Sequence, residues 1–144
     1  SALGAIVRLI NMGVEPYLIT ASVIGVLAQR LVRKLCDECK APLSADQAQA
    51  AAASLGVPLP EGRAMYHAVG CPACRGTGYR GRLAVHELLL MTEDVKKLVL
   101  ERGSSLGGAD GAYAGGNLLH DGATKVFQGL TTAEEVLRVA RQND

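Results

Sequence analysis

The sequence predicts an α/β chain made of small units, one of which depends on a bound metal. Three observations support this prediction: helical apolar spacing gives way to strand-like alternation before residue 36, the four cysteines form two Cys-x-x-Cys pairs, and aromatic residues are scarce. With no tryptophan, one phenylalanine and four tyrosines in 144 residues, large side chains for a single core are few. We therefore expect two or three small units.

Charge and hydropathy exclude several classes of protein. The 15 lysines and arginines nearly balance 14 acidic residues, so no global field attracts nucleic acid. The longest uncharged apolar stretch, residues 16–28, is shorter than the ~18 residues that a membrane-spanning helix requires. The amino terminus has no basic leader and no cleavage signal, which favours a cytosolic protein. Since the sequence opens without Met inside an amphipathic pattern, we expect a piece of a longer protein.

The first 35 residues predict two helices and a strand. A helical apolar stripe ends at Gly13 and is formed by Leu3, Ile6, Val7 and Ile10. A second helix begins at Glu15-Pro16, where proline is acceptable in the first turn, and is expected to run, mostly apolar and buried, from Tyr17 to about Ala28. Alternation over residues 29–35 then predicts a strand leading into Cys36.

The middle of the chain predicts two capped helices and a second strand. Ser44 and Gln47 form a capping box for an Ala-rich helix that ends near Leu55, and residues 60–63 are expected to be a loop. Alternation over residues 82–90 indicates a strand. Thr92 is a candidate N-cap for a helix that stops near Gly103.

The last third predicts a loop followed by two helices. Six glycines fall within residues 103–116, and each costs about 1 kcal/mol in a helix interior relative to alanine, so a flexible loop or linker is expected there. A helix is predicted over residues 118–128. Residues 131–135 contain a capping box for a last helix that reaches about Arg141.

The strongest chemical signal is the cysteine pattern. All four cysteines lie in two pairs separated by 31 residues, namely Cys36 with Cys39 and Cys71 with Cys74. Each Cys-x-x-Cys pair can form a tight turn, called a knuckle, and two such knuckles can present four thiolates to one tetrahedral ion. Zinc is the first choice for a closed site of soft sulfur ligands, and an iron–thiolate centre and redox dithiols or disulfides are the alternatives. The metal would be structural, because four protein sulfurs leave no open position for water.

The segment 36–74 has few large apolar groups and is close to the ~40 residues below which a fold usually needs a metal.

Other polar residues carry weaker signals. His67 and His86 are possible ligands by residue type alone. Two groups of basic residues fit either a phosphate or partner contact or a solvated turn: Arg75, Arg80 and Arg82 among the glycines after the second knuckle, and Arg30, Arg33 and Lys34 before the first. No phosphate-binding loop, metalloprotease motif or nucleophile elbow is present, so no catalytic or cofactor-binding residue is assigned.

The order of several further motifs resembles the secretion and type IV pilus assembly ATPases. The motifs are residues 5–19 and 26–36, Cys71-Pro72-x-Cys74 followed by Gly76, residues 78–82 and 86–89, and then residues 121–122, 125–126, 129–131 and 134–139. The likeness is greatest to the GspE type, which drives type II secretion, and next to the PilB type, which extends pili. It covers residues 1–102 and 117–141 and corresponds to the carboxyl-terminal part of such a motor. Residues 104–116 depart from it, since the family usually has a charged helical segment there.

The resemblance implies a division of the chain into five segments. Residues 1–35 would end a RecA-like ATPase domain, 36–80 would form an inserted tetracysteine zinc-binding subdomain, 81–102 a strand and helix returning to the ATPase core, 103–116 the Gly-rich loop, and 117–144 a C-terminal helical subdomain. Of the family's functional residues, only the zinc ligands carry over, to Cys36, Cys39, Cys71 and Cys74. The phosphate-binding loop and the acidic motifs for MgATP lie upstream of Ser1 in the family pattern, which leaves open whether this piece is an enzyme.

The resemblance also implies a setting for the parent protein. The family works as a cytoplasmic homo-hexamer, peripheral to the bacterial inner membrane, and hydrolyses ATP with Mg²⁺ to assemble a pseudopilus or pilus. This piece would help to close the hexamer and contact inner-membrane platform proteins, with neither nucleic acid nor a membrane span of its own. Two alternatives remain open. Residues 71–78 also resemble one repeat of the DnaJ-type zinc motif, which fits a free-standing interaction module, whereas a dithiol redox protein lacks the expected βαβ surroundings.

Overall fold

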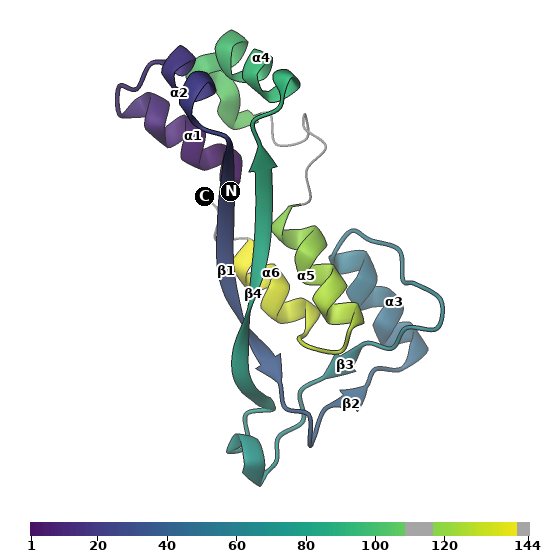
Figure 1. The fold of residues 1–144 in the computed structure, drawn as a ribbon. Helices are drawn as coiled ribbons and strands as arrows, with labels where there is room; N and C mark the ends of the chain where they lie inside the picture. Colours follow the sequence, from purple (N-terminus) through teal and green to yellow (C-terminus); the bar gives the residue numbers. More distant parts are fainter. Residues whose placement is uncertain (109–116, 141–144) are drawn as a thin grey trace. The chain divides into compact units, whose positions relative to one another are not determined.

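The computed structural model describes residues 1–108 and 117–140, which form two compact units (Figure 1). Of these, residues 1–28, 87–108 and 117 belong to the first unit, and residues 29–86 and 118–140 to the second. Two long strands, β1 (Gly25–Leu35) and β4 (Tyr79–Leu90), pair in a two-stranded sheet and contribute residues to both units. The helices and strands confirm the predicted α/β class.

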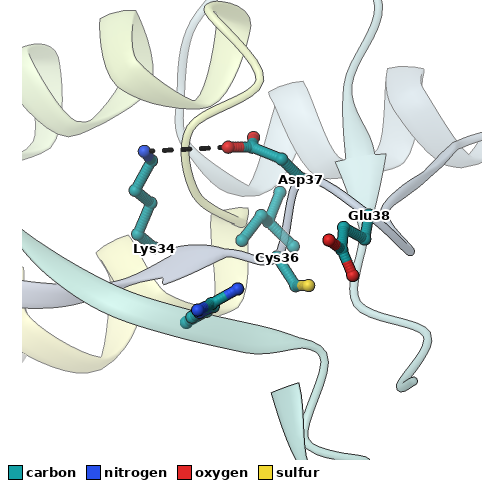
Figure 2. A pocket seen from close by; sticks show the side chains of 6 residues that line it. Lys34, Cys36, Asp37 and Glu38 are labelled. Carbon is teal, nitrogen blue, oxygen red and sulfur yellow. Dashed lines mark ion pairs between the residues drawn. The ribbon is translucent and has the colours of Figure 1, made fainter. Parts of the chain in front are cut away.

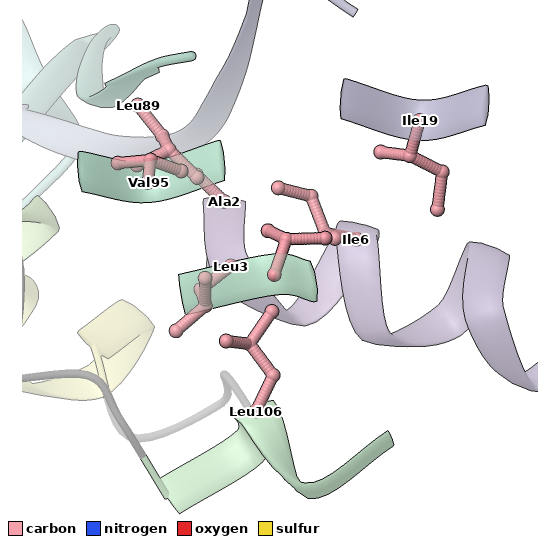
Figure 3. Close-up of a cluster of buried hydrophobic side chains, with 8 residues drawn as sticks. Ala2, Leu3, Ile6, Ile19, Leu89, Val95 and Leu106 are labelled. Atoms are coloured by element: carbon pink, nitrogen blue, oxygen red, sulfur yellow. The ribbon is translucent and has the colours of Figure 1, made fainter. Parts of the chain in front are cut away.

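The first unit gathers helices around the amino-terminal one. Helix α1 (Ala2–Asn11) contains the predicted apolar stripe and ends just before the predicted stop at Gly13. It is capped by the Ser1 hydroxyl, which accepts the Gly4 N–H at 3.0 Å. The Ala2 N–H donates to the buried carboxylate of Glu87 at 3.1 Å, which ties α1 to β4. The apolar stripe of α1 enters a buried cluster (Figure 3), whose members are Ala2, Leu3, Ile6, Ile19, Leu89, Val95, Val99 and Leu106.

The second predicted helix is much shorter than expected. Helix α2 (Pro16–Ser22) ends where Val23 becomes extended, and residues 25–28 belong to strand β1. The Met91 N–H donates to the Ile24 carbonyl at 2.9 Å, so pairing with the segment after β4 takes over at this point. A continuous apolar run fits a helix or a strand equally well, and β-branched residues favour the strand once a partner is available. The expected burial is also wrong at the start of α2, where the Tyr17 side chain is 60% exposed.

Residues 92–108 follow the prediction and then depart from it. Helix α4 (Glu93–Arg102) is capped by the Thr92 hydroxyl, as predicted, and ends at Gly103. Residues Gly103–Gly108 then form a 3₁₀ segment, η2, rather than a loop, and Leu106 is fully buried. The glycine penalty applies to longer α-helices, and a single large apolar side chain is enough to hold a short 3₁₀ segment against a core. Residues 109–116 of the predicted loop lie outside the described residues.

The second unit contains residues 36–74, here called the cysteine segment, and the last two helices. Between the cysteine pairs lie the short strands β2 (Ala41–Pro42) and β3 (Tyr66–His67), which pair antiparallel, and helix α3 (Ala45–Ser54). The predicted capping box of Ser44 and Gln47 is present in both directions, at 3.2 and 3.1 Å. A 3₁₀ turn, η1 (Pro72–Cys74), precedes β4, which begins three residues before the predicted strand.

Helices α5 (Leu118–Phe127) and α6 (Ala133–Ala140) complete the second unit, close to their predicted positions. Their apolar residues do not form a separate core. They share one with the cysteine segment, in a cluster made of Ala48, Ala52, Leu55, Met65, Ala123, Val126, Ala133 and Val136. The scarcity of apolar groups in residues 36–74 is therefore compensated by residues from the end of the chain.

Within residues 1–108 and 117–140, no helix combines the length and the apolar character that crossing a bilayer requires.

Candidate metal centre

The four cysteines lie in two tight turns that the ends of the long strands bring together. Cys36 follows β1 and Cys39 closes a turn in which the Lys40 N–H donates to the Cys36 carbonyl at 3.0 Å. Cys71 precedes η1, and Cys74 is its last residue. The Cys36 N–H donates to the Gly78 carbonyl at 3.0 Å. Pairing at this point links the first knuckle to the chain that leaves the second.

The sulfur positions match the geometry of a tetrahedral metal site. All four Sγ atoms lie within 4.8 Å of one another. The Sγ of Cys36 is 3.8 Å from that of Cys71, Cys39 is 3.8 Å from Cys74, and Cys71 is 3.7 Å from Cys74. Four sulfurs about 2.3 Å from a common zinc ion would lie about 3.8 Å apart. These separations are far longer than the ~2.05 Å of a disulfide, so the arrangement could hold a metal ion.

Backbone N–H groups point at two of the sulfurs. The Cys74 Sγ accepts from the N–H groups of Cys71 at 3.2 Å and Gly78 at 3.1 Å, and the Cys39 Sγ accepts from Gly70 at 3.3 Å. Such bonds stabilise thiolates and orient metal ligands. The same segments are packed closely, because a Cβ added to Gly78 would lie 2.5 Å from the Ala68 Cβ.

The surroundings move the pKa values of two thiols in opposite directions. Burial tends to raise the pKa of Cys74, but the N–H groups of Cys71 and Gly78 and the neighbouring thiols lower it to about 6. The Gly70 N–H tends to lower the pKa of Cys39, but burial and the other three thiols raise it to about 11. The thiolate is the form of cysteine that binds a metal, so Cys74 is prepared for a metal, whereas Cys39 would release a proton on binding one.

A hollow of about 380 Å³ lies beside the first knuckle (Figure 2). It is lined by Lys34, Leu35, Cys36, Asp37, Glu38 and Arg80. Lys34 lies 3.9 Å from Asp37, so the walls carry both signs of charge. This mixture does not suit a phosphate group, which would meet two carboxylates there.

The other candidates from the sequence do not join the metal site. In the part of the chain that the structure describes, the metal-ligating cluster contains the four cysteines and neither histidine. His67 is exposed with its ring near the Ala68 carbonyl, and His86 lies 3.8 Å from Asp121. Arg75, Arg80 and Arg82 are exposed, whereas Arg33 is bound by Glu135 at 2.9 Å.

Several residues that support the centre had no signal in the sequence. The Lys40 ammonium donates to the Gly129 carbonyl at 2.9 Å and lies 4.8 Å from the Tyr66 ring centroid. The Tyr79 hydroxyl lies 2.9 Å from the Thr132 hydroxyl. These pairs are separated by 89 and 53 residues, so no local pattern could have indicated them.

Comparisons with known proteins identify the family. Residues 1–138 match the family described as type II/IV secretion system protein. The chain is 45% identical over 145 residues to type II secretion system protein E of Pectobacterium carotovorum, and 42% identical over 144 residues to type II secretion system ATPase E of Vibrio cholerae. Each alignment covers 99% of this chain and 28% of the relative.

A pilus protein is also among the relatives. The type IV pilus assembly ATPase PilB of Thermus thermophilus is 42% identical over 135 residues, which are 92% of this chain and 15% of that protein. The chain thus spans less than a third of the length of these relatives. The match over nearly all of its own length nevertheless shows that the chain belongs to the type II/IV secretion system protein family, as the motif order predicted.

Proposed function

We propose that this chain is the carboxyl-terminal part of a type II secretion ATPase, in which Cys36, Cys39, Cys71 and Cys74 hold one structural zinc ion. The observation that carries the zinc assignment is the set of sulfur separations, 3.8 Å between the two knuckles and 3.7 Å within the second. An ion bound there would supply about 10–16 kcal/mol of apparent binding free energy. Its role would be to fold the cysteine segment, since four sulfurs close the coordination sphere.

In the parent protein, the proposed role of these residues is structural. Residues 1–35 and 81–102 would complete a RecA-like domain, 36–80 would form the zinc subdomain and 117–144 a helical cap. The names of the relatives support a type II secretion ATPase, with a type IV pilus assembly ATPase as the alternative. The parent would then assemble a pseudopilus or, in the alternative, extend a pilus. The parent would act as a hexamer at the inner membrane with its platform proteins. ATP and Mg²⁺ would be bound by residues upstream of Ser1.

Metal analysis of the purified chain tests the zinc assignment. We expect one zinc per chain and thiols that react with a disulfide reagent only after a chelator is added. Stoichiometric iron with visible charge-transfer absorbance would replace zinc by iron in the assignment and leave the four-cysteine site standing. Reactive thiols without stoichiometric metal would overturn the site.

The coding sequence upstream of Ser1 tests the motor assignment independently of the metal. We expect a phosphate-binding loop and acidic Mg²⁺-binding motifs there, and ATP hydrolysis by the complete protein. A coding sequence without a phosphate-binding loop would leave the family membership intact and overturn the proposed motor.

A further inference from the structure

We infer that the turn over residues 129–132, which joins α5 to α6, is an outer part of the metal centre: it positions the segments that carry the cysteines, so that metal binding and docking of the α5–α6 pair strengthen each other. This inference rests on the proposed structural metal. It assigns positioning roles to Lys40, Tyr79 and Gly129. All of these residues belong to the second unit.

The first knuckle is held at both of its ends. The Leu35 N–H, next to Cys36, donates to the Leu130 carbonyl at 2.8 Å. The Lys40 ammonium, next to Cys39, donates to the Gly129 carbonyl at 2.9 Å. The turn therefore accepts one hydrogen bond from each residue that flanks the Cys36–Cys39 pair, which sets the spacing at which the knuckle enters and leaves the site.

The second knuckle is held by two aromatic residues on its flanks. Tyr66 precedes Cys71, and a Cβ added to Gly129 would lie 3.1 Å from its ring. Tyr79 follows Cys74, and its hydroxyl lies 2.9 Å from the Thr132 hydroxyl. Tyr79 also follows Gly78 directly. The Gly78 N–H donates to the Cys74 sulfur, and the Gly78 carbonyl accepts the Cys36 N–H.

The turn thus meets the chain before and after each cysteine pair. Metal binding draws the two pairs together, and only that arrangement presents all four flanking contacts at once. If zinc binding favours docking of the α5–α6 pair, then by thermodynamic linkage the docked pair must make zinc bind more tightly. Weakening the turn contacts is therefore expected to weaken metal binding, although none of these residues is a ligand.

Substitution of Lys40 offers the sharpest test, because the chain supplies a matched control. Lys40→Met removes the bond to Gly129 and an ion pair with Asp37 at 3.6 Å, while Lys96→Met removes an equivalent (i, i+3) ion pair with Glu93 at 2.9 Å in the first unit. Zinc affinity of the full chain would be measured by competition with a metal-binding dye. We expect about a fivefold loss for Lys40→Met, the value of one net hydrogen bond, and no change for Lys96→Met.

The ligand set provides a further readout. The Co²⁺-loaded Lys40→Met chain should keep the visible absorption bands of the unmodified chain, because the four sulfurs are unchanged. Equal zinc affinity in all three chains would overturn the inference. Altered Co²⁺ bands would also overturn it, since Lys40 would then change the ligand sphere directly.

A second variant keeps the test decisive if Lys40→Met folds poorly. Gly129 has φ +75°, and a Cβ there would also lie 3.3 Å from the Lys40 ammonium. Gly13 has φ +98° with nothing within 4 Å of an added Cβ. Both alanine variants carry backbone strain, but only Gly129→Ala should lower zinc affinity. Equal affinities in the two alanine variants would count against the turn as part of the centre.

Hydrogen exchange tests the reciprocal effect, namely that metal binding stabilises the α5–α6 pair. Removing zinc with a chelator should speed amide exchange in α5 and α6 by at least tenfold and leave α1 and α4 of the first unit unchanged. Unchanged exchange in α5 and α6, in a chain that binds stoichiometric zinc, would overturn the coupling and leave the proposed metal site standing. Absence of zinc from the chain would instead overturn the proposed site.

Discussion

The carboxylate of Glu135 on α6 binds Arg33 on β1 through both the backbone and the side chain of that arginine. Its Oε2 accepts the Arg33 N–H at 2.8 Å, and its Oε1 accepts from the guanidinium at 2.9 and 3.1 Å. The Glu135 side chain is 3% exposed. Arg138 adds a further bond at 2.9 Å, and the Arg33 guanidinium lies 4.1 Å from the Tyr79 ring centroid. A residue expected only to cap its own helix therefore joins that helix to a strand.

Neutralising this carboxylate should cost stability in a pH-dependent way. Burial alone would raise the pKa of Glu135, but hydrogen bonds from Arg138 and Arg33 lower it from 4.5 to about 2. A lowered folded pKa means that the carboxylate contributes its full stability above about pH 4.5 and loses it as the pH falls through about 2. We expect Glu135→Gln to lower the free energy of unfolding at pH 7 by about 1–3 kcal/mol.

Urea unfolding of both chains between pH 7 and pH 2 measures this effect. The difference in the free energy of unfolding between the unmodified chain and Glu135→Gln should narrow as the pH falls below 4.5. A difference that stays constant with pH would show that the charge of Glu135 is not the cause. Glu134→Gln, an exposed neighbour on the same helix, serves as the control and should differ little from the unmodified chain.

Close packing of α5 on α6 should make an added methyl group harmful at Gly122. A Cβ there would overlap the Val136 side chain, with the Val136 Cγ2 at 2.9 Å. Helix propensity alone would make Gly122→Ala stabilising by about 1 kcal/mol, whereas overpacking costs about 1–3 kcal/mol. We expect net destabilisation, measured as a lower urea midpoint. A higher midpoint would mean that the two helices separate at little cost.

The capping box of α3 should contribute measurably to the free energy of unfolding. Ser44→Ala removes the hydroxyl that accepts the Gln47 N–H, and loss of an N-cap typically costs about 0.5–2 kcal/mol. Ser54→Ala, at the other end of the same helix, removes a hydroxyl that donates only to the Ala51 carbonyl. We expect the first variant to lower the free energy of unfolding and the second to change it by a few tenths of a kcal/mol. Equal effects would contradict a specific cap.

Loss of one cysteine should affect the second unit selectively. In Cys71→Ser, three thiols remain, and we expect zinc content to fall well below one per chain and limited proteolysis to cut within residues 36–80. Because Leu3, Ile6 and Val99 pack in the separate core of the first unit, cleavage within α1 and α4 should stay slow. A variant with full zinc content and unchanged protease resistance would contradict a structural role for the site.

Features that depend on neighbours in the sequence were predictable. The caps at Ser44 and Thr92 were found because a side chain and an amide three residues apart suffice to define them. The cysteine pairs were found because each Cys-x-x-Cys knuckle is a local turn whose two thiols lie close enough to bind one ion. Helices 2–11, 45–54, 93–102, 118–127 and 133–140 all lie close to their predicted places for the same reason.

Long-range contacts decided the rest. The apolar run after Pro16 could form a helix or a strand, and pairing of Ile24 with Met91 selected the strand. Leu106 is held by a core that includes Leu3 and Ile6, from the other end of the chain's first unit. The sequence by itself therefore determined the family, the class of fold and the four thiols. Only the tertiary structure brought residues 129–132 to the flanks of those thiols, because contacts across 53 or 89 residues depend on how the whole unit packs.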